Sequence, residues 1–157
     1  MKYRASPNGW SCLITCASMV LEKEIVELTQ MLGHDGSEQI PGPKGPSRRG
    51  FSVEEIMYLF MKFRVPAWSF NKQLLHYYSA QPIGQDCWCK YTVLQTFPNW
   101  SEIIQEKRKI VMNEKHSWVE WDGQQFDPAY KNPFPNKIVQ GVIVIGDHLP
   151  SSPEVHT

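Results

Sequence analysis

The sequence lacks both a long apolar run and an excess of charge of either sign. None of its apolar stretches approaches the roughly eighteen residues that a membrane-spanning helix needs. Basic and acidic side chains number 16 each, so the electrostatic footprint of a nucleic-acid-binding protein is missing. Residues 1–4 also lack the apolar core of a signal peptide. We therefore expect a cytoplasmic protein with no membrane and no nucleic-acid partner, whose cysteines are thiols.

Cysteine is scarce, and the spacing of the four cysteines argues against a metal site. Cys87 and Cys89 are separated by one residue, which on a strand places both side chains on one face. A structural zinc site needs about four ligands, and no second pair of closely spaced cysteines follows. We therefore expect no metal and no cofactor.

The sequence has no internal repeat and no sign of a second domain. A chain of 157 residues is normally one domain and is long enough to bury a substantial core. We expect one domain over residues 1–147 and a flexible tail over residues 148–157, which are rich in proline and serine. The sequence leaves the oligomeric state open.

The most informative stretch is residues 6–21, where a turn rich in Pro, Asn and Gly leads into a helix of small and apolar residues. Ser11 is a good N-cap residue, so Cys12 falls at the first helical position. Unpaired amides and the positive end of the helix dipole favour a negative charge there. We therefore expect the Cys12 thiol to ionise more easily than a free one, beside amides that can hold an oxyanion. The alternative is a buried structural cysteine.

Cys16 follows Cys12 by one helical turn and lies on the same face of this helix, which is predicted over residues 11–22. We interpret Cys16 as a small core residue. The alternative is a resolving or disulfide partner for Cys12.

A second stretch, residues 116–128, has the pattern of a β-hairpin. Its first residues alternate in polarity, and Asp122-Gly123 is the strongest short signal for a hairpin turn. The register of such a turn gives the pairs Trp121 with Gln124, Val119 with Phe126 and Trp118 with Asp127. That register brings Asp127 close to His116, where a carboxylate can fix the tautomer of an imidazole. The alternative is an ordinary hairpin with an exposed histidine.

Together the two stretches resemble the papain-like cysteine peptidases, in which a cysteine on an N-terminal helix precedes a histidine that opens a strand and an Asp or Asn on the next strand. The resemblance is closest to the bacteriocin-processing (C39-like) peptidases and their small phage and bacterial relatives. It rests on Trp10-Ser11-Cys12-Leu13, Ala17-Ser18-Met19, His116-Ser117-Trp118-Val119 and Phe126-Asp127-Pro128-Ala129. Residues 32–38 and 48–51 also look like the small phage members.

The resemblance implies an α+β, papain-like fold, in which N-terminal helices pack on a twisted antiparallel sheet formed by residues 88–145. It implies Cys12 as the nucleophile, His116 as the general base and Asp127 as the group that orients His116. The implied reaction is cleavage of an amide or isopeptide bond in a peptide or protein, through a thioacyl intermediate on Cys12.

Asn8, Trp10 and Ser11 are the expected oxyanion or substrate-binding residues. Papain-like enzymes usually carry a Gln six residues before the nucleophile, whereas Ser6 stands there in this chain. Because losing one oxyanion donor costs about 10²–10³ in rate, Ser6 leaves three alternatives open. These are a slow enzyme, altered acyl-transfer chemistry, and a fold kept for binding.

Two other functions fit the same residues. A papain-like fold can serve as a protein-binding module, for example between a phage and its host, because fold does not guarantee function. A thiol-dependent acyltransferase of the transglutaminase or arylamine-acetyltransferase type would use the same three side chains.

Local signals predict the remaining elements. Ser52 and Glu55 form a capping-box pattern at the start of a predicted helix, and Gly33 is a stop signal for another. We predict helices over residues 24–32, 52–62 and 102–107, the last of them capped by Asn99 or Ser101. We predict strands over residues 65–70, 109–113 and 138–145. Residues 73–78 fit either a helical turn or a strand.

Residues 33–50, rich in Gly, Pro and charge, are predicted to be a long loop and a candidate rim of the cleft. We interpret His34-Asp35 in this loop as part of a polar loop tip, with a metal or catalytic pair as the alternative.

Overall fold

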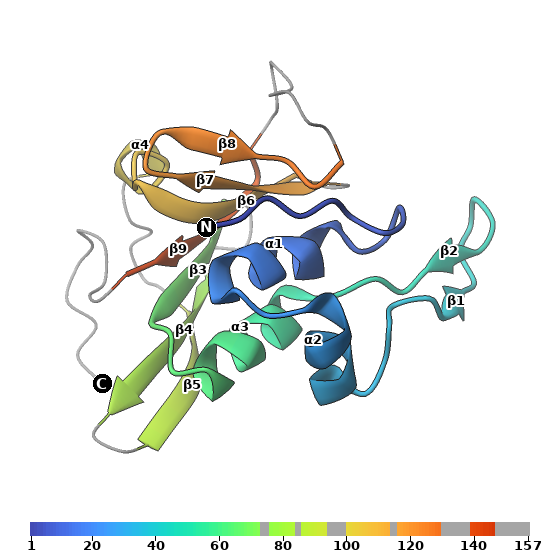
Figure 1. Ribbon diagram of the computed structural model, residues 1–157, viewed down its shortest axis with the longest axis horizontal. Helices are drawn as coiled ribbons and strands as arrows, with labels where there is room; N and C mark the ends of the chain where they lie inside the picture. Colours follow the sequence, from blue (N-terminus) through green and yellow to red (C-terminus); the bar gives the residue numbers. More distant parts are fainter. Residues whose placement is uncertain (73–75, 84–85, 94–99, 114–115, 130–138, 147–157) are drawn as a thin grey trace.

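The computed structural model describes residues 1–72, 76–83, 86–93, 100–113, 116–129 and 139–146, with the backbone alone described over 76–83 and 86–93. In this part of the chain the fold is α+β, with helices near the N-terminus and one large antiparallel sheet (Figure 1). No helix among these residues has the length and apolarity needed to span a membrane. The expected tail, Asn99 and the side chains of Cys87 and Cys89 lie outside the described residues.

The helix that carries the candidate nucleophile is α1 (Cys12–Leu21), close to its predicted bounds. The Ser11 side chain makes no capping bond; instead its carbonyl accepts from the amide and the hydroxyl of Thr15, at 2.9 and 2.6 Å. Residues 14–19 are all buried, because the small side chains among them let three elements approach from several sides: α2 (Ile25–Leu32), α3 (Val53–Lys62) and the strand β7 (Ser117–Trp121). Cys16 is fully buried in this core.

The other two N-terminal helices begin and end where capping chemistry predicts. α2 (Ile25–Leu32) ends at Gly33, whose φ of 79° is a left-handed conformation that glycine adopts readily. α3 (Val53–Lys62) has a complete capping box: the Glu55 amide donates to Ser52 Oγ at 3.2 Å, and the Ser52 amide donates to Glu55 Oε1 at 3.0 Å. Both predicted helices are confirmed.

The large sheet has the strand order β5-β4-β3-β9-β6-β7-β8, and every neighbouring pair is antiparallel. Its strands are β3 (Ala67–Asn71), β4 (His76–Ile83), β5 (Asp86–Val93), β6 (Arg108–Met112), β7 (Ser117–Trp121), β8 (Gln124–Phe126) and β9 (Gly141–Ile145). The prediction that the sheet spans residues 88–145 is too short, because the sheet also includes β3 and β4. Residues 67–70 are buried on both faces of β3, which suits its central place between β4 and β9.

The β7–β8 hairpin has the predicted register. Val119 pairs with Phe126 and Trp121 pairs with Gln124. The turn residues Asp122 and Gly123 have φ values of 49° and 87°, and a two-residue type I′ turn requires positive φ at both positions.

The helix predicted over residues 102–107 is wrong in its bounds, since α4 spans Trp100–Ile103. The amides of residues 105 and 106 donate to the carbonyls three residues earlier, so the chain continues in tighter turns. The Lys107 carbonyl then accepts from the Asp122 amide at 2.8 Å. This bond draws residue 107 into the ladder between β6 and β7, so the helix ends earlier than its charge pattern predicts.

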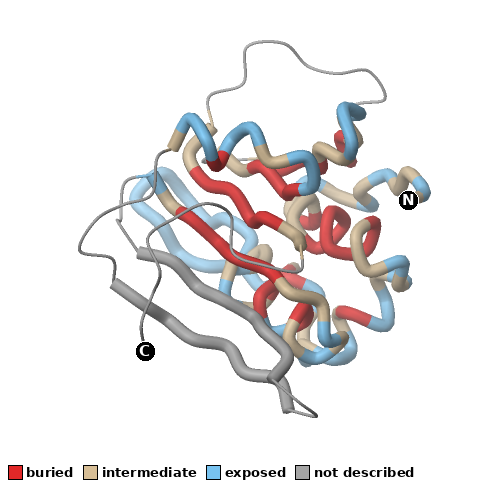
Figure 2. The backbone as a smooth tube through the Cα atoms, turned by 90° about the vertical axis from the view of Figure 1, so that its left-hand side faces the viewer, coloured by how far each residue is buried: buried red, intermediate tan, exposed pale blue. Residues whose placement is uncertain are grey.

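The sheet buries apolar side chains on both faces. The N-terminal helices cover one face, where they pack over Ala67, Ile110, Val119 and Ile143. A second cluster on the other face consists of Trp68, Phe70, Ile103, Val142 and Val144. Figure 2 shows the buried residues concentrated in the helices and the central strands.

The predicted loop at residues 33–50 contains a small hairpin. β1 (Gln39–Ile40) pairs with β2 (Ser47–Arg48), and the Arg49 amide continues the pairing by donating to the Glu38 carbonyl at 2.7 Å. The hairpin projects beyond α2 at one end of the molecule (Figure 1). It forms one wall of the pocket described next.

Candidate active site

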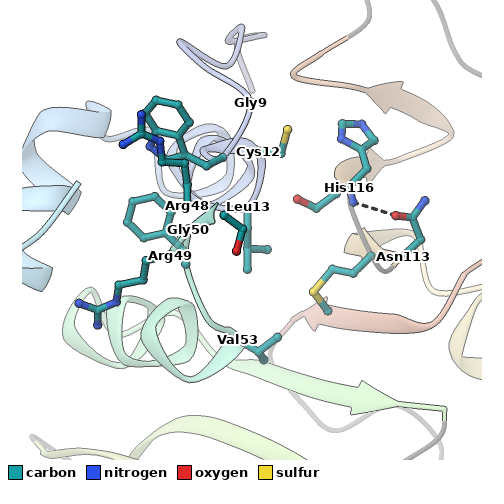
Figure 3. Close-up of a pocket in the computed structure, with 14 residues that line it drawn as sticks. Gly9, Cys12, Leu13, Arg48, Arg49, Gly50, Val53, Asn113 and His116 are labelled. Atoms are coloured by element: carbon teal, nitrogen blue, oxygen red, sulfur yellow. Dashed lines mark hydrogen bonds between the residues drawn. The ribbon is translucent and has the colours of Figure 1, made fainter. Parts of the chain in front are cut away.

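Cys12 and His116 meet at one pocket, although they lie far apart in the sequence. The pocket has a volume of about 760 Å³ and is lined by 14 residues from the start of α1, the β1–β2 hairpin, the start of α3 and the ends of β6 and β7. In Figure 3 the Cys12 sulfur lies on the side of α1 that faces the His116 ring. α1 packs against β7, and this contact brings the two side chains to the same opening.

Asp127 holds the His116 ring by one nitrogen. His116 Nε2 lies 2.7 Å from Asp127 Oδ1, and the same oxygen accepts from the Ala129 amide at 2.9 Å. Asp127 is only 2 % exposed, so little water competes for its carboxylate. A charge-assisted bond in such a setting is strong and directional, and it fixes the orientation of the ring.

The turn that precedes β7 also positions His116. The His116 amide donates to Asn113 Oδ1 at 2.8 Å, as Figure 3 shows, and the Asn113 amide donates to the His116 carbonyl at 2.9 Å. The His116 ring stacks on Trp118 with its centroid 6.0 Å away. The histidine is thus fixed through its backbone as well as its ring. Sequence reasoning missed Asn113, although an asparagine shortly before a strand is a common turn residue whose side chain can bond to nearby backbone amides.

A backbone bond joins the loop before Cys12 to the segment that carries Asp127. The Ser6 amide donates to the Pro128 carbonyl at 2.8 Å. Ser6 Oγ donates to the Asn8 carbonyl at 2.6 Å, and the Trp10 amide donates to Asn8 Oδ1 at 3.1 Å. These bonds shape the turn by which the chain enters α1, so the loop before Cys12 and the segment that carries Asp127 are held together.

The three expected oxyanion or substrate-binding residues lie in different places. Trp10 lines the pocket, and its Nε1 donates to the Asp35 carbonyl at 3.2 Å. Asn8 and Ser11 are not among the described residues that line the pocket; Asn8 uses its side-chain oxygen within the turn, and Ser11 is buried at the N-cap of α1. The first-turn amides of α1 have no carbonyl partner within the helix, and the Cys12 amide is one of them.

Burial sets the ionisation of the Cys12 thiol. Desolvation raises the pKa of Cys12 above the ordinary 9.0, hydrogen bonding by the Ser6 side chain lowers it, and the negative charge of Asp127 raises it. The expectation of an unusually acidic thiol is therefore wrong, because loss of hydration opposes the thiolate more than the remaining groups favour it. A thiol whose pKa is raised in this way needs a base to take its proton as it reacts.

Replacing Ser6 by Ala is expected to raise the pKa of Cys12 further, because the hydrogen bond that lowers it is lost. Alkylation by iodoacetamide consumes the thiolate, so its rate at pH 8 should fall and the midpoint of its pH–rate curve should move to higher pH. Ser47→Ala removes another serine hydroxyl from this region and should leave the midpoint unchanged. An unshifted midpoint in Ser6→Ala would contradict the assigned contact.

The His34-Asp35 pair serves local structure. His34 Nε2 is bonded to Glu55 Oε2, and His34 Nδ1 accepts from the Gly36 amide at 3.0 Å. Asp35 Oδ1 accepts from the amide and the hydroxyl of Ser37. Within the described ranges no three His, Cys, Asp or Glu side chains are grouped so that they could hold a metal ion.

Gly36 supports the wall of the pocket from behind. Its φ is 76°, and a Cβ there would lie 2.8 Å from the Phe51 ring and 3.1 Å from Trp10 Cδ1. Gly36→Ala is expected to lower the free energy of unfolding by about 2–4 kcal/mol, measured in urea, because it adds a steric clash to the left-handed backbone.

Gly33→Ala provides the matched control for this effect. Gly33 has a similar φ of 79° but no atom within 4 Å of the added Cβ, so only the backbone cost of about 1–2 kcal/mol applies. Equal losses in the two variants would mean that Gly36 is not crowded by the pocket wall.

Comparison of the chain with protein-family models, with curated proteins and with solved structures finds no match in any of the three. The site is therefore interpreted from its own geometry.

Proposed function

We propose that the protein is a cysteine hydrolase that cleaves an amide or isopeptide bond through a thioacyl intermediate on Cys12. One observation carries the proposal. Cys12, at the N-terminus of a helix, shares a pocket with His116. The Nε2 atom of His116 is bonded, at 2.7 Å, to the buried Asp127. A nucleophile, a base and a group that orients the base are the parts that covalent catalysis requires.

In the proposed reaction His116 moves the proton and Cys12 carries the acyl group. Since Nε2 is bonded to Asp127, we assign proton transfer to Nδ1. The sulfur attacks the carbonyl carbon as Nδ1 takes the thiol proton. The amine then leaves with that proton, and the acyl group stays on Cys12 as a thioester. Water next gives a proton to Nδ1 and its hydroxide to the acyl carbon. The C–S bond then breaks, the acid leaves, and the sulfur takes the proton back from Nδ1.

The raised pKa of Cys12 fits this order of events. A thiol that stays neutral at rest needs His116 as a base during the attack, rather than a preformed thiolate and imidazolium. The Cys12 amide is the proposed donor to the oxyanion of each tetrahedral intermediate, where one donor contributes about 10²–10³ in rate. Trp10, at the edge of the same pocket, is the proposed contact with the substrate chain.

We further propose that the fold is papain-like and that the relatives of the chain are the bacteriocin-processing type of peptidase and its small phage-encoded members. The support is the order of Cys12 on an N-terminal helix, His116 before a strand and Asp127 after the next strand, together with helices that cover one face of an antiparallel sheet. The substrate on this proposal is a peptide or a protein.

A mixture of fluorogenic peptide amides tests the proposal. We expect release of free amine and free acid, and we expect alkylation of Cys12 to stop it. Product analysis in the presence of an added primary amine then separates the rival functions. A new amide product in place of the acid would assign an acyltransferase, whereas no turnover with reversible capture of peptide would assign a binding module and overturn the hydrolase.

A further inference from the structure

Arg48 lies at the pocket, and within the described residues no carboxylate pairs with its charge. Its Nη1 donates to the Ser37 carbonyl at 2.7 Å, and its guanidinium lies over the Trp10 ring, 5.0 Å from the centroid. In the part of the chain that the structure describes, Arg48 forms no ion pair. A neutral carbonyl and an aromatic face therefore hold its charged group in place.

The neighbouring Arg49 is in a different situation. Its Nη1 lies 3.7 Å from Glu38 Oε2, and its Nη2 lies 3.7 Å from Glu55 Oε2. Two carboxylates thus share the charge of Arg49. Both arginines line the pocket, but among the described residues no carboxylate pairs with Arg48, so its guanidinium can bind an anionic ligand.

The described lining of the pocket is positively charged, although the chain as a whole carries no net charge. The formal net charge of the protein is +0, yet the described residues that line the pocket include two arginines and no Asp or Glu. In the view of Figure 3, Arg48 and Arg49 lie on the opposite side of Cys12 from His116. A local excess of one sign in a concave site attracts ligand groups of the opposite sign.

We propose that the pocket selects peptides that carry a carboxylate close to the scissile bond, and that Arg48 binds this carboxylate. The inference rests on the proposed hydrolase function and names its substrate class. A guanidinium binds a carboxylate through two parallel hydrogen bonds, and Arg48 uses only Nη1 within the described structure. An acidic side chain and the C-terminus of a short peptide both supply this group.

Peptidyl acyloxymethyl ketones, which alkylate a catalytic cysteine without turnover, test the inference. The two probes of a pair differ only in having Glu or Gln at one position before the ketone, and each pair tests a different position. Intact-mass spectrometry follows the labelling of Cys12. We expect one Glu probe to label the wild type about tenfold faster than its Gln partner, as a charge-assisted contact provides. Arg48→Gln should remove this preference, Arg48→Lys should keep part of it, and Arg49→Gln should keep most of it.

A second arm distinguishes the two sources of the carboxylate. Short peptides with a free or an amidated C-terminus compete with the ketone. Protection by the free acid alone, lost in Arg48→Gln, would assign the C-terminus. Equal labelling by every Glu and Gln pair, with equal protection by acid and amide, would overturn the inference.

Iodoacetamide separates failure of this inference from failure of the proposed function. Its rate at Cys12 should be the same in the wild type and in Arg48→Gln, because Arg48 is not among the groups that shift the pKa of the thiol. If iodoacetamide modifies Cys12 but no ketone does, the hydrolase proposal fails and the substrate class falls with it. Labelling by ketones without a charge preference overturns the role of Arg48 alone.

Discussion

Replacing Cys12 by Ala is expected to lower the rate of peptide amide hydrolysis by about 10⁴-fold or more, because it removes the sulfur that forms the thioacyl bond in the proposed reaction. Cys12 lies half-buried at the pocket, outside the apolar core, so the variant should fold and unfold much as the wild type does. The measurement is kcat/KM on a fluorogenic amide that the wild type cleaves, with thermal unfolding recorded in parallel.

Cys16→Ala is the matched control, since it makes the same chemical change one turn later on α1. Cys16 is fully buried in the main core, so this variant should lose stability, by about 1–2 kcal/mol, and keep its activity. A folded Cys12→Ala that still hydrolyses at the wild-type rate would remove Cys12 from the mechanism. A folded Cys16→Ala that loses as much activity as Cys12→Ala would also remove the special role of Cys12.

The second large effect is expected at Asp127. Asp127→Ala removes the acceptor of two hydrogen bonds, one with His116 Nε2 and one from the Ala129 amide. Leaving these buried groups without a partner should lower the free energy of unfolding by about 1–3 kcal/mol. A loosely held imidazole should also lower kcat by about 10²–10⁴-fold, with a smaller change in KM. Urea unfolding and separate values of kcat and KM measure the two effects.

Two further variants show whether Asp127 acts by positioning His116. Asp127→Asn keeps an acceptor oxygen for both bonds, so it should restore most of the stability and part of kcat. Asp122→Asn removes the charge of an exposed aspartate of the same hairpin, which pairs with Arg108 at 3.1 Å, and Asn tolerates the positive φ of the turn. It should leave kcat unchanged and cost no more than the small stability of an exposed ion pair. Wild-type kcat in Asp127→Ala would show that His116 needs no carboxylate.

The bounds of α2 and α3 and the β7–β8 hairpin were predictable because local chemistry determines them. Ser52 with Glu55 begins α3, Gly33 ends α2, and Asp122-Gly123 sets the β7–β8 register. Counting residues along that register predicts that His116 and Asp127 lie close together. The hydrogen bond between their side chains confirms this prediction.

Features that depend on long-range packing were not predictable in the same way. The central place of β3 comes from pairing with β9, more than seventy residues later. Arg48 and Arg49 line the pocket because the β1–β2 hairpin brings Arg48 against Trp10, just before α1. The direction of the Cys12 pKa shift depends on how deeply the sulfur is buried, and the sequence around Cys12 carries only the opposing effect of the helix N-terminus.

The central claim is that His116 takes the proton of Cys12. The most direct measurement is the rate of Cys12 alkylation by iodoacetamide between pH 6 and pH 9, in the wild type, in His116→Ala and in His34→Ala as a matched histidine control bonded to Glu55. We expect His116→Ala to slow alkylation at pH 7 by about tenfold or more, as loss of a general base does, while His34→Ala leaves it unchanged. Superimposable pH–rate curves for the wild type and a folded His116→Ala would show that His116 does not take the proton of Cys12.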